Sequence, residues 1–350
     1  MYLVRRIVIA VFACLTLLPC CSSAQQTTVT ELSTYLDQAH QAGLFNGNVL
    51  VADHGKVILR RALGDADGSQ LVPLTLADRF YIGSIAKEFD AVGLLILAQD
   101  GKLALTDPLS KFFPDLPPWA ATVTIDNLLH YTSGLQEPDW NIVHSDADNW
   151  KELHALQHLN SVPGTHYAYS NNNVFLRRRV IEKVSGMSFE EFLVKREFPK
   201  AGIRNAVIDP ADAEPLIAKS FDANHKQDAP IAPISGWVCL SLDDFLRWSD
   251  CIRDFCLITP SSTRQIVTTQ NPAWQTGLGQ AEMKGDQLLS HVHDGSVFHY
   301  RALLMMDAPK GRTIILLSNQ NQNNIYDIGN AIDAMLDHKA YSPLSASKND

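Results

Sequence analysis

The chain has 350 residues, of which 46% are hydrophobic and 19% are charged, and its formal net charge is −9. This length and composition suit a soluble globular protein of about two domains. The acidic balance argues against nucleic-acid binding, because phosphate backbones attract clustered lysine and arginine.

The first 24 residues are typical of a signal peptide. Arg5 and Arg6 precede an apolar run over residues 7–18, and Ser22-Ser-Ala24 supplies a small-residue cleavage signal. The apolar run is too short to span a bilayer. We therefore predict export to a bacterial periplasm or beyond the cell. Cleavage after Ala24 would leave 27 basic and 38 acidic side chains, a net charge of −11.

The cysteines leave two questions open. Cys20 or Cys21 can carry a lipid, and only such a lipoprotein anchor would bring the chain to a membrane. Cys239, Cys251 and Cys256 remain after cleavage. We expect buried thiols, with a disulfide between Cys251 and Cys256 as the alternative.

The mature chain begins with patterns for one helix and one hairpin. A Thr28-x-x-Glu31 capping box predicts a helix over 29–42 that stops at Gly43. Apolar strands over 48–52 and 57–63 follow, joined by the turn residues Asp53-His-Gly-Lys56, which favour a hairpin. An apolar helix over 84–99 comes next.

Helical patterns dominate the middle of the chain and strand patterns return near its end. The expected helices are one capped near Thr124, one over 173–184, one begun by Ser188-x-x-Glu191, and a final amphipathic one carrying Ile325, Ile328, Ile332 and Leu336. The expected late strands cover 288–292, 301–306 and 312–317.

This order of elements predicts an α+β fold with one antiparallel sheet built from both ends of the chain. The sheet domain would comprise residues 28–104 and 234–340, with a mostly helical insert over 105–233 and a polar tail over 341–350. A catalytic cleft is expected at the seam between the two parts.

A serine and a lysine stand three residues apart at the start of the 84–99 helix. Residues at this spacing share a helix face, so Lys87 would aim its amine at the Ser84 hydroxyl. The spacing alone is weak evidence, because Ser345-Ala-Ser-Lys348 repeats it in the polar tail. The blander interpretation is that Ser84 only caps the helix.

Two further motifs supply partners for this pair, Tyr169-Ser-Asn171 in the helical middle and His293-Asp-Gly295 after a late strand. A phenol beside an ammonium ionises more easily, and a crowded lysine loses its proton more easily. Either Tyr169 or Lys87 can therefore take the proton of Ser84. Asn171 is expected to donate to a substrate carbonyl and accept from Lys87.

With these motifs in this order, the chain resembles the serine β-lactamase and penicillin-binding protein superfamily. The branch is the class C β-lactamase-like one, which includes D-Ala-D-Ala carboxypeptidases, D-aminopeptidases and esterases. The likeness runs from about Gly47 to Leu336. It also rests on Gly101-Lys-Leu-Ala-Leu-Thr-Asp107, Leu128-Leu-His-Tyr-Thr-Ser-Gly134, Gly277-Leu-Gly279 and Leu317-Ser-Asn319.

The resemblance implies a β-lactamase/transpeptidase-like fold and a role for each motif residue. Ser84 would be the acylated nucleophile, and Lys87 and Tyr169 would share the acid and base work. Asn171 would orient the substrate, and His293 to Gly295 would match the family's third motif. The oxyanion hole would consist of the backbone N–H groups of Ser84 and Ser296.

The third motif departs from the K-T-G of the best-known β-lactamases. A lysine there gives a permanent cation for a substrate carboxylate, which His293 does not. The resemblance therefore favours an esterase or a D-amino-acid peptidase over a true β-lactamase, which remains the alternative. Bulky residues follow Ser296, and Arg301 is a candidate to restore the missing positive charge.

Other signals are weak. His154 and His158 stand four residues apart without a third metal ligand, and no nucleotide-binding glycine motif occurs, so we expect no cofactor and no metal. The expected partner is a small-molecule or short-peptide substrate. A module that binds penicillin or peptidoglycan without turnover is the alternative from another class.

Overall fold

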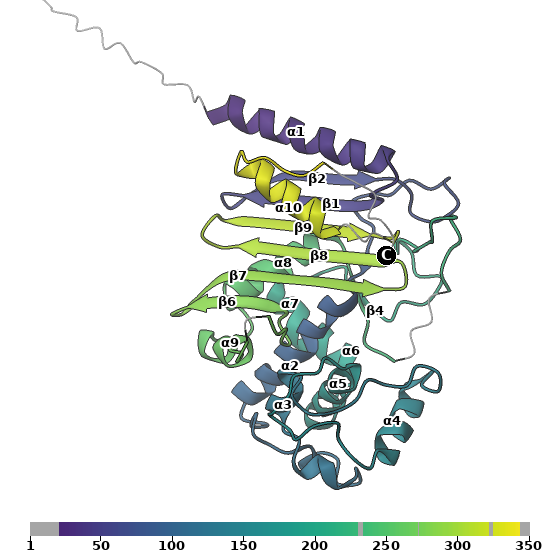
Figure 1. Cartoon of the computed structure of the whole chain (residues 1–350), viewed down its shortest axis with the longest axis vertical. Coiled ribbons are helices and arrows are strands. Elements are labelled where there is room, and N and C mark those ends of the chain that lie inside the picture. Colours follow the sequence, from purple (N-terminus) through teal and green to yellow (C-terminus); the bar gives the residue numbers. More distant parts are fainter. Residues whose placement is uncertain (1–20, 230–233, 272, 322–324, 344–350) are drawn as a thin grey trace, which may run out of the picture.

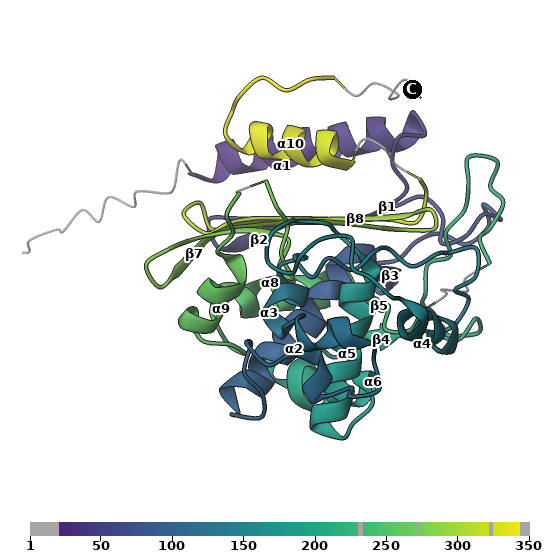
Figure 2. The same cartoon turned by 60° about the horizontal axis from the view of Figure 1, so that its bottom comes forward.

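A six-stranded sheet lies between two helical layers in the computed structural model, which describes residues 21–229, 234–271, 273–321 and 325–343. Figure 2 views the sheet edge-on, with α1 (Cys21–Gln41) and α10 (Ile325–Leu336) on one face. The opposite face carries α2 (Lys87–Gln99), α5 (Asn171–Ser185) and α8 (Leu242–Arg253) (Figure 1). This is the α+β arrangement that the sequence predicted.

Every strand pair in the large sheet is antiparallel, in the order β2-β1-β9-β8-β7-β6. β1 pairs directly with β9, from Gly47 opposite Ser318 to Ala52 opposite Thr313, so the two ends of the chain meet in mid-sheet as expected. The strands are β1 (Gly47–Asp53), β2 (Lys56–Leu63), β6 (Gln280–Lys284), β7 (Gln287–Val297), β8 (Tyr300–Asp307) and β9 (Arg312–Ser318).

Two strand predictions need correction. β7 continues to Val297 rather than ending near Val292, so His293 to Ser296 lie within a paired strand. β6 was missed, because its sequence Gln-Ala-Glu-Met-Lys has no buried position and so no apolar face to read. The β1–β2 hairpin is confirmed: His54 and Gly55 form its two-residue loop with φ values of 49° and 73°, as a type I′ turn requires.

The remaining helices confirm several predicted starting points. Thr124 caps α3 through a capping box with Asn127, and the Ser188 hydroxyl accepts from the Glu191 amide at the start of α6. Their bounds are α3 (Ile125–Leu129), α4 (Asp146–Ala155), α6 (Phe189–Phe192), α7 (Phe198–Ala201) and α9 (Pro260–Val267), with shorter turns η1 (Gly83–Ala86), η2 (Leu109–Lys111), η3 (Pro118–Ala121) and η4 (Leu193–Glu197).

The N-terminal helix begins earlier than predicted. α1 starts at Cys21 rather than Val29, so the predicted capping box lies inside it. The Thr30 hydroxyl bonds the carbonyl of Gln26 one turn back, at 2.9 Å. Residues 21–28 include no glycine or proline that would stop the helix. Residues 1–20 and the second serine–lysine pair of the tail lie outside the described residues.

A small second sheet fixes the segment that carries Ser84. It consists of β3 (Phe80–Tyr81), β5 (Val238–Leu240) and β4 (Val207–Ile208), in the order β3-β5-β4. The Ile82 amide donates to the Val238 carbonyl at 3.2 Å, which continues this pairing up to η1. The backbone ahead of Ser84 is therefore held on one side by β5.

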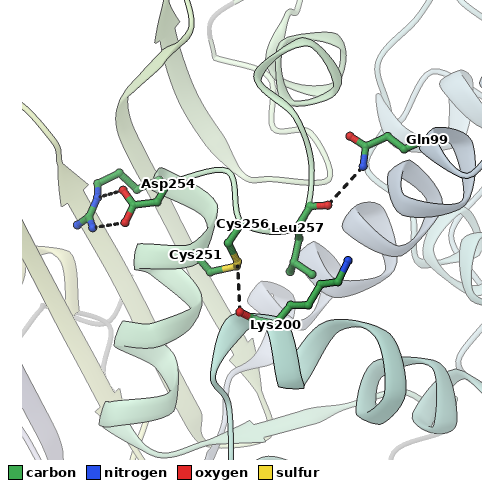
Figure 3. The surroundings of a disulfide bond; sticks show 7 residues. Gln99, Lys200, Cys251, Asp254, Cys256 and Leu257 are labelled. Atoms are coloured by element: carbon green, nitrogen blue, oxygen red, sulfur yellow. Dashed lines mark hydrogen bonds and ion pairs between the residues drawn. A yellow bond between two sulfur atoms is a disulfide. The ribbon is translucent and has the colours of Figure 1, made fainter.

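Cys251 and Cys256 form a disulfide at the end of α8 (Figure 3). Their Cα atoms lie 5.0 Å apart, because the chain reverses at Phe255, whose φ is 55°. The Cys256 sulfur lies 3.6 Å from the carbonyl oxygen of Lys200. The expectation of buried thiols is therefore wrong for this pair, whereas Cys239 is a buried free thiol as predicted.

None of the helices in the described ranges combines the length and the apolar character needed to cross a membrane. The predicted domain boundaries remain predictions.

Candidate active site

Ser84 lies in the 3₁₀ turn η1, one turn ahead of α2. The residue in the N-cap position of η1 is Ile82, and it makes no side-chain cap bond. The Ser84 Oγ instead accepts hydrogen bonds from Lys87 Nζ and from Tyr169 OH, each at 3.0 Å. The capping interpretation of Ser84 is therefore wrong, and the distant Tyr169 meets the neighbouring Lys87 at the Ser84 oxygen.

Lys87 is almost fully buried, with 3% of its surface exposed. Its Nζ lies 5.4 Å from the ring centroid of Tyr169 and 5.5 Å from that of Trp237. Burial is the main cause that lowers the pKa of Lys87 to about 7, and the positive charge of Arg178 adds to it. A substantial share of this amine is therefore neutral near pH 7 and able to accept a proton.

Tyr169 lies two residues before α5, and its ring stacks on Tyr131 with centroids 4.8 Å apart. Burial raises the pKa of Tyr169 to about 12, which outweighs the lowering by the Ser84 hydrogen bond and by Arg177. The expectation that a neighbouring ammonium favours the tyrosinate is wrong. Near neutral pH Tyr169 is a phenol, and it acts as a hydrogen-bond donor to Ser84.

Asn171, the first residue of α5, contacts a glutamate rather than Lys87. Its amide N–H donates to Glu137 Oε2 at 2.7 Å and its Nδ2 donates to Glu137 Oε1 at 2.5 Å. The Trp140 Nε1 also donates to Oε1, at 3.2 Å. The expected bond from Lys87 to Asn171 does not occur among the hydrogen bonds of the described residues. Sequence reasoning missed Glu137, because an exposed glutamate in a loop carries no pattern.

Two glycines allow η1 to lie directly against β7. A Cβ on Gly83, whose φ is 57°, would lie 2.4 Å from the Ser296 amide nitrogen. A Cβ on Gly295 would lie 2.0 Å from the Ile82 carbonyl oxygen and 2.9 Å from the Ser84 amide nitrogen. Since real Cβ atoms do not tolerate such contacts, only glycine fits at both positions. The close contact of η1 with β7 brings together the backbone nitrogens of Ser84 and Ser296, whose N–H groups are the predicted oxyanion donors.

The His293 side chain binds Glu88 of α2 rather than Ser84. Its Nδ1 lies 2.6 Å from Glu88 Oε1, and His291 Nε2 lies 2.8 Å from the same oxygen. The Trp248 Nε1 donates to Glu88 Oε2 at 2.6 Å. Burial alone would raise the pKa of Glu88, but charge attraction from His291 and the hydrogen bonds from His291 and His293 lower it to about 2, so the carboxylate is ionised and both imidazole rings donate to it.

The Glu88, His291 and His293 side chains are the group among the described residues whose ligand-type atoms gather within 4.8 Å of one another. Both histidine nitrogens approach a single carboxylate oxygen at hydrogen-bond distance, and a tryptophan N–H binds the other oxygen. We therefore interpret the group as a hydrogen-bonded cluster. Sequence reasoning missed Glu88, His291 and Trp248, which no local spacing connects.

Arg301 lies on β8 opposite Ser296, but its guanidinium is hydrogen-bonded to oxygens of other residues. Nη1 donates to the carbonyls of Phe298 at 3.1 Å and Tyr300 at 2.8 Å, and Nη2 bonds the Asn321 side chain. Among the described residues, no hydrogen bond joins it to Ser84, Lys87 or Tyr169. His154, the other lone candidate, pairs with Asp115 at the surface.

A pocket of about 670 Å³ flanks the site between α9 and the strands β6 and β7. Trp274 of its lining stacks on Tyr167 with ring centroids 5.2 Å apart, and a Cβ on Gly279 would meet the His293 ring at 2.6 Å. On β7 the lining includes Ser290 and Val292, which directly precede the third motif, and it does not include Ser84, Lys87 or Tyr169.

The family profile described as Beta-lactamase matches residues 31–337 of the chain. PbpX of Bacillus subtilis, which is named as a penicillin-binding protein, is 25% identical over 303 residues that cover 84% of this chain and 74% of PbpX. The structure of FmtA from Staphylococcus aureus matches with a TM-score of 0.74 and 18% identity over 94% of both chains.

A structure described as a beta-lactamase/D-alanine carboxypeptidase from Pseudomonas syringae matches with a TM-score of 0.72 and 18% identity. The match covers 91% of this chain and all of that one. At these identities the structural matches show the fold alone, whereas the family profile spans most of the sequence. The chain belongs to the beta-lactamase family.

Proposed function

We propose that this chain is an exported serine hydrolase that forms an acyl-enzyme at Ser84 on an ester or amide substrate, as an esterase or a D-amino-acid peptidase. The observation that carries the proposal is the shared contact at Ser84 Oγ, with Lys87 Nζ and Tyr169 OH each 3.0 Å away. A serine hydroxyl is a weak nucleophile until a neighbouring base takes its proton.

The proposed reaction assigns each proton to a group. Neutral Lys87 takes the proton of Ser84 as Oγ attacks the substrate carbonyl carbon, and the N–H groups of Ser84 and Ser296 stabilise the oxyanion. The proton then passes to the departing alcohol or amine by way of the Tyr169 hydroxyl, and the acyl-enzyme remains. Water hydrolyses that ester with the same groups in reverse.

The charges near Ser84 favour substrates that lack a carboxylate. The third motif has His293 where the best-known β-lactamases have a lysine, and the His293 ring is hydrogen-bonded to Glu88. The guanidinium of Arg301 is occupied by two backbone carbonyls and Asn321. Glu137 adds a negative charge beside Asn171, which repels a substrate carboxylate and attracts a free amine.

Two alternatives differ in what they predict. A true β-lactamase would turn over a chromogenic cephalosporin, and the match to the family profile described as Beta-lactamase favours it. A penicillin- or peptidoglycan-binding module would form an adduct without turnover, and the name of PbpX favours that one. The same proposal includes export and a small-molecule or short-peptide substrate. A lipid anchor at Cys20 or Cys21 is its alternative to free release.

The first test is covalent labelling of the mature protein with a fluorescent fluorophosphonate and a fluorescent penicillin, followed by intact mass measurement. Ser84→Ala should lose the adduct and reduce ester hydrolysis by about 10⁴-fold, because the nucleophile is gone. Ser345→Ala is the matched control, since it removes the serine of the other serine–lysine pair. Equal labelling of Ser84→Ala and the parent protein would refute the assignment.

A substrate panel separates the three functions. We expect turnover of a neutral p-nitrophenyl ester or of a D-amino-acid p-nitroanilide with a free amine, and little turnover of the cephalosporin. Faster turnover of the cephalosporin than of either of the others would identify a β-lactamase. An adduct that persists with every substrate would identify the binding module.

A further inference from the structure

A second charged group lies on α2, one turn beyond Lys87. Asp90 follows Lys87 at the three-residue spacing that normally pairs a lysine with an acid on one helix face. The Asp90 carboxylate instead faces α5, where Oδ1 lies 2.6 Å from Arg177 Nε and Oδ2 lies 3.3 Å from Arg178 Nε. In the described part of the chain, Lys87 forms no ion pair with an acid.

This cluster holds more positive than negative charge in a dry interior. Asp90 and Arg177 have no exposed surface, and Arg178 has 2%. Two guanidinium groups face a single carboxylate, and an arginine stays protonated in a protein. The Nη1 of Arg177 has no hydrogen-bond partner among the described residues.

Glu197 is the neighbouring acid, and it does not neutralise the extra charge. Its Oε1 lies 3.0 Å from where a Cβ on Gly93 of α2 would stand, and neither carboxylate oxygen has a hydrogen-bond partner in the described structure. Burial, with the negative charge of Asp90, raises the pKa of Glu197 well above its ordinary value. Among the described residues, Glu197 therefore forms no ion pair with Arg177 or Arg178.

The remaining titratable groups around Lys87 do not supply a close counter-ion. Tyr169 and Tyr131 are phenols whose pKa values burial raises, and the Glu137 carboxylate is bound to Asn171 and Trp140. Glu88, next to Lys87 in sequence, directs its carboxylate to His291 and His293 of β7.

We propose that the cluster of Asp90, Arg177 and Arg178 withholds the natural counter-ion from Lys87 and leaves a net positive charge behind it, which keeps Lys87 a neutral amine for the reaction at Ser84. Arg178 is then a positioning residue, since it acts through Lys87 and is buried away from substrate. The inference rests on the proposed function, because it requires Lys87 to accept the proton of Ser84.

Electrostatics gives the sign of the expected effect. Among the charged neighbours of Lys87, Arg178 contributes most to lowering its pKa, after burial. Removing this cation raises the pKa of Lys87 and reduces the fraction of neutral amine at pH 7. The acidic limb of the pH profile of kcat/KM reports that ionisation in the free enzyme.

The experiment compares three variants of the mature protein with an uncharged p-nitrophenyl ester between pH 5 and 10. Arg178→Gln leaves Asp90 balanced by Arg177 and removes one charge. Arg178→Lys keeps the charge but loses the guanidinium bond to the Ser235 carbonyl. Arg179→Gln is the matched control, because the next arginine of α5 pairs with Asp146 and Glu182 instead.

In Arg178→Gln we expect the acidic limb of the kcat/KM profile to move to higher pH by about one unit. At pH 7 kcat/KM should then fall about tenfold, and it should recover at high pH. Arg178→Lys and Arg179→Gln should keep the parent limb. An unmoved limb in Arg178→Gln overturns the inference. An equal shift in Arg178→Lys also overturns it, because the effect would then come from the loop bond and not from charge.

Asp90→Asn gives a second, opposite test if Arg178→Gln does not fold. It leaves both guanidinium groups without a carboxylate, so the acidic limb should move to lower pH, measured on protein shown to be folded by near-UV circular dichroism. A shift to higher pH contradicts the inference. The proposed function fails separately, through normal labelling of Ser84→Ala, whatever these profiles show.

Discussion

Two buried carboxylates on α2, Glu88 and Asp90, stand two residues apart and have no exposed surface, yet their pKa values move in opposite directions. The pKa of Glu88 falls to about 2, whereas burial raises that of Asp90. Asp90 has the two permanent cations beside it, so the number of nearby charges does not explain the difference.

The two carboxylates differ in how their oxygens are hydrogen-bonded. Glu88 accepts from three ring N–H groups at 2.6 to 2.8 Å, so both of its oxygens are bound. Asp90 Oδ1 has the Arg177 nitrogen at 2.6 Å but no aligned hydrogen bond, and only Oδ2 accepts one, from Arg178. Aligned donors offset the cost of burying a carboxylate, and nearby charge without alignment does so incompletely.

The two clusters on α2, one around Glu88 and one around Asp90, connect this helix to different elements. The Glu88 cluster ties α2 to β7 and α8, which holds the third motif against the Ser84 turn. The Asp90 cluster ties α2 to α5 and leaves unneutralised charge near Lys87. We therefore expect the first cluster to govern stability and the second to govern the pH dependence of activity.

The largest loss of stability is expected for Glu88→Gln. This change removes the ionised acceptor from three buried donors, and the free energy of unfolding should fall by roughly 3 kcal/mol. Urea denaturation at pH 7 measures it. Because the pKa of Glu88 lies below its ordinary value of 4.5, its contribution is complete above that pH and is lost as pH falls toward 2. Equal acid sensitivity in the variant and the parent would contradict the assignment.

A smaller loss is expected for Trp248→Phe, which removes one donor to Glu88. The Trp248 ring stacks on Phe89 with centroids 3.9 Å apart, and a phenylalanine preserves most of this packing. Loss of one hydrogen bond to a charged acceptor should cost about 2 kcal/mol. The thermal midpoint and the urea curve measure this. A variant as stable as the parent would show that Glu88 does not need its third donor.

The smallest loss of stability is expected for Arg178→Gln, although the residue is as buried as Glu88. Its removal leaves Asp90 balanced in charge by Arg177, and the glutamine amide keeps an N–H donor for the Asp90 Oδ2 that Arg178 binds, so we expect a cost of about 1 kcal/mol. The same urea experiment measures it beside Glu88→Gln. A cost equal to that of Glu88→Gln would remove the distinction between the two clusters.

The sequence predicted the parts of the site that lie in short motifs. Ser84 and Lys87 meet because one helical turn separates them, and the order of strand and helix patterns predicted the sheet that unites both ends of the chain. Tyr169 was predicted from a motif and lies at Ser84 as expected. The sequence left open whether Tyr169 or Lys87 takes the proton, since the burial that shifts their pKa values cannot be read from a short motif.

The missed residues are those whose partners lie far away along the chain. Glu88 contacts Trp248, 160 positions later, and His291, 203 positions later, and no periodicity links such positions. Asn171 was assigned to Lys87 although Glu137 binds it, because side-chain amides accept many partners and only their spatial arrangement selects one.

The sequence by itself determined the groups to which we assign the chemistry, since a serine hydroxyl, an amine and a phenol in ordered motifs are chemical identities. The tertiary structure decided their ionisation and their counter-ions. Packing α2 between β7 and α5 buries Lys87, turns Glu88 toward two histidines and turns Asp90 toward two arginines. Desolvation and hydrogen-bond alignment depend on what surrounds a group in space, and so they appear only when the chain is folded.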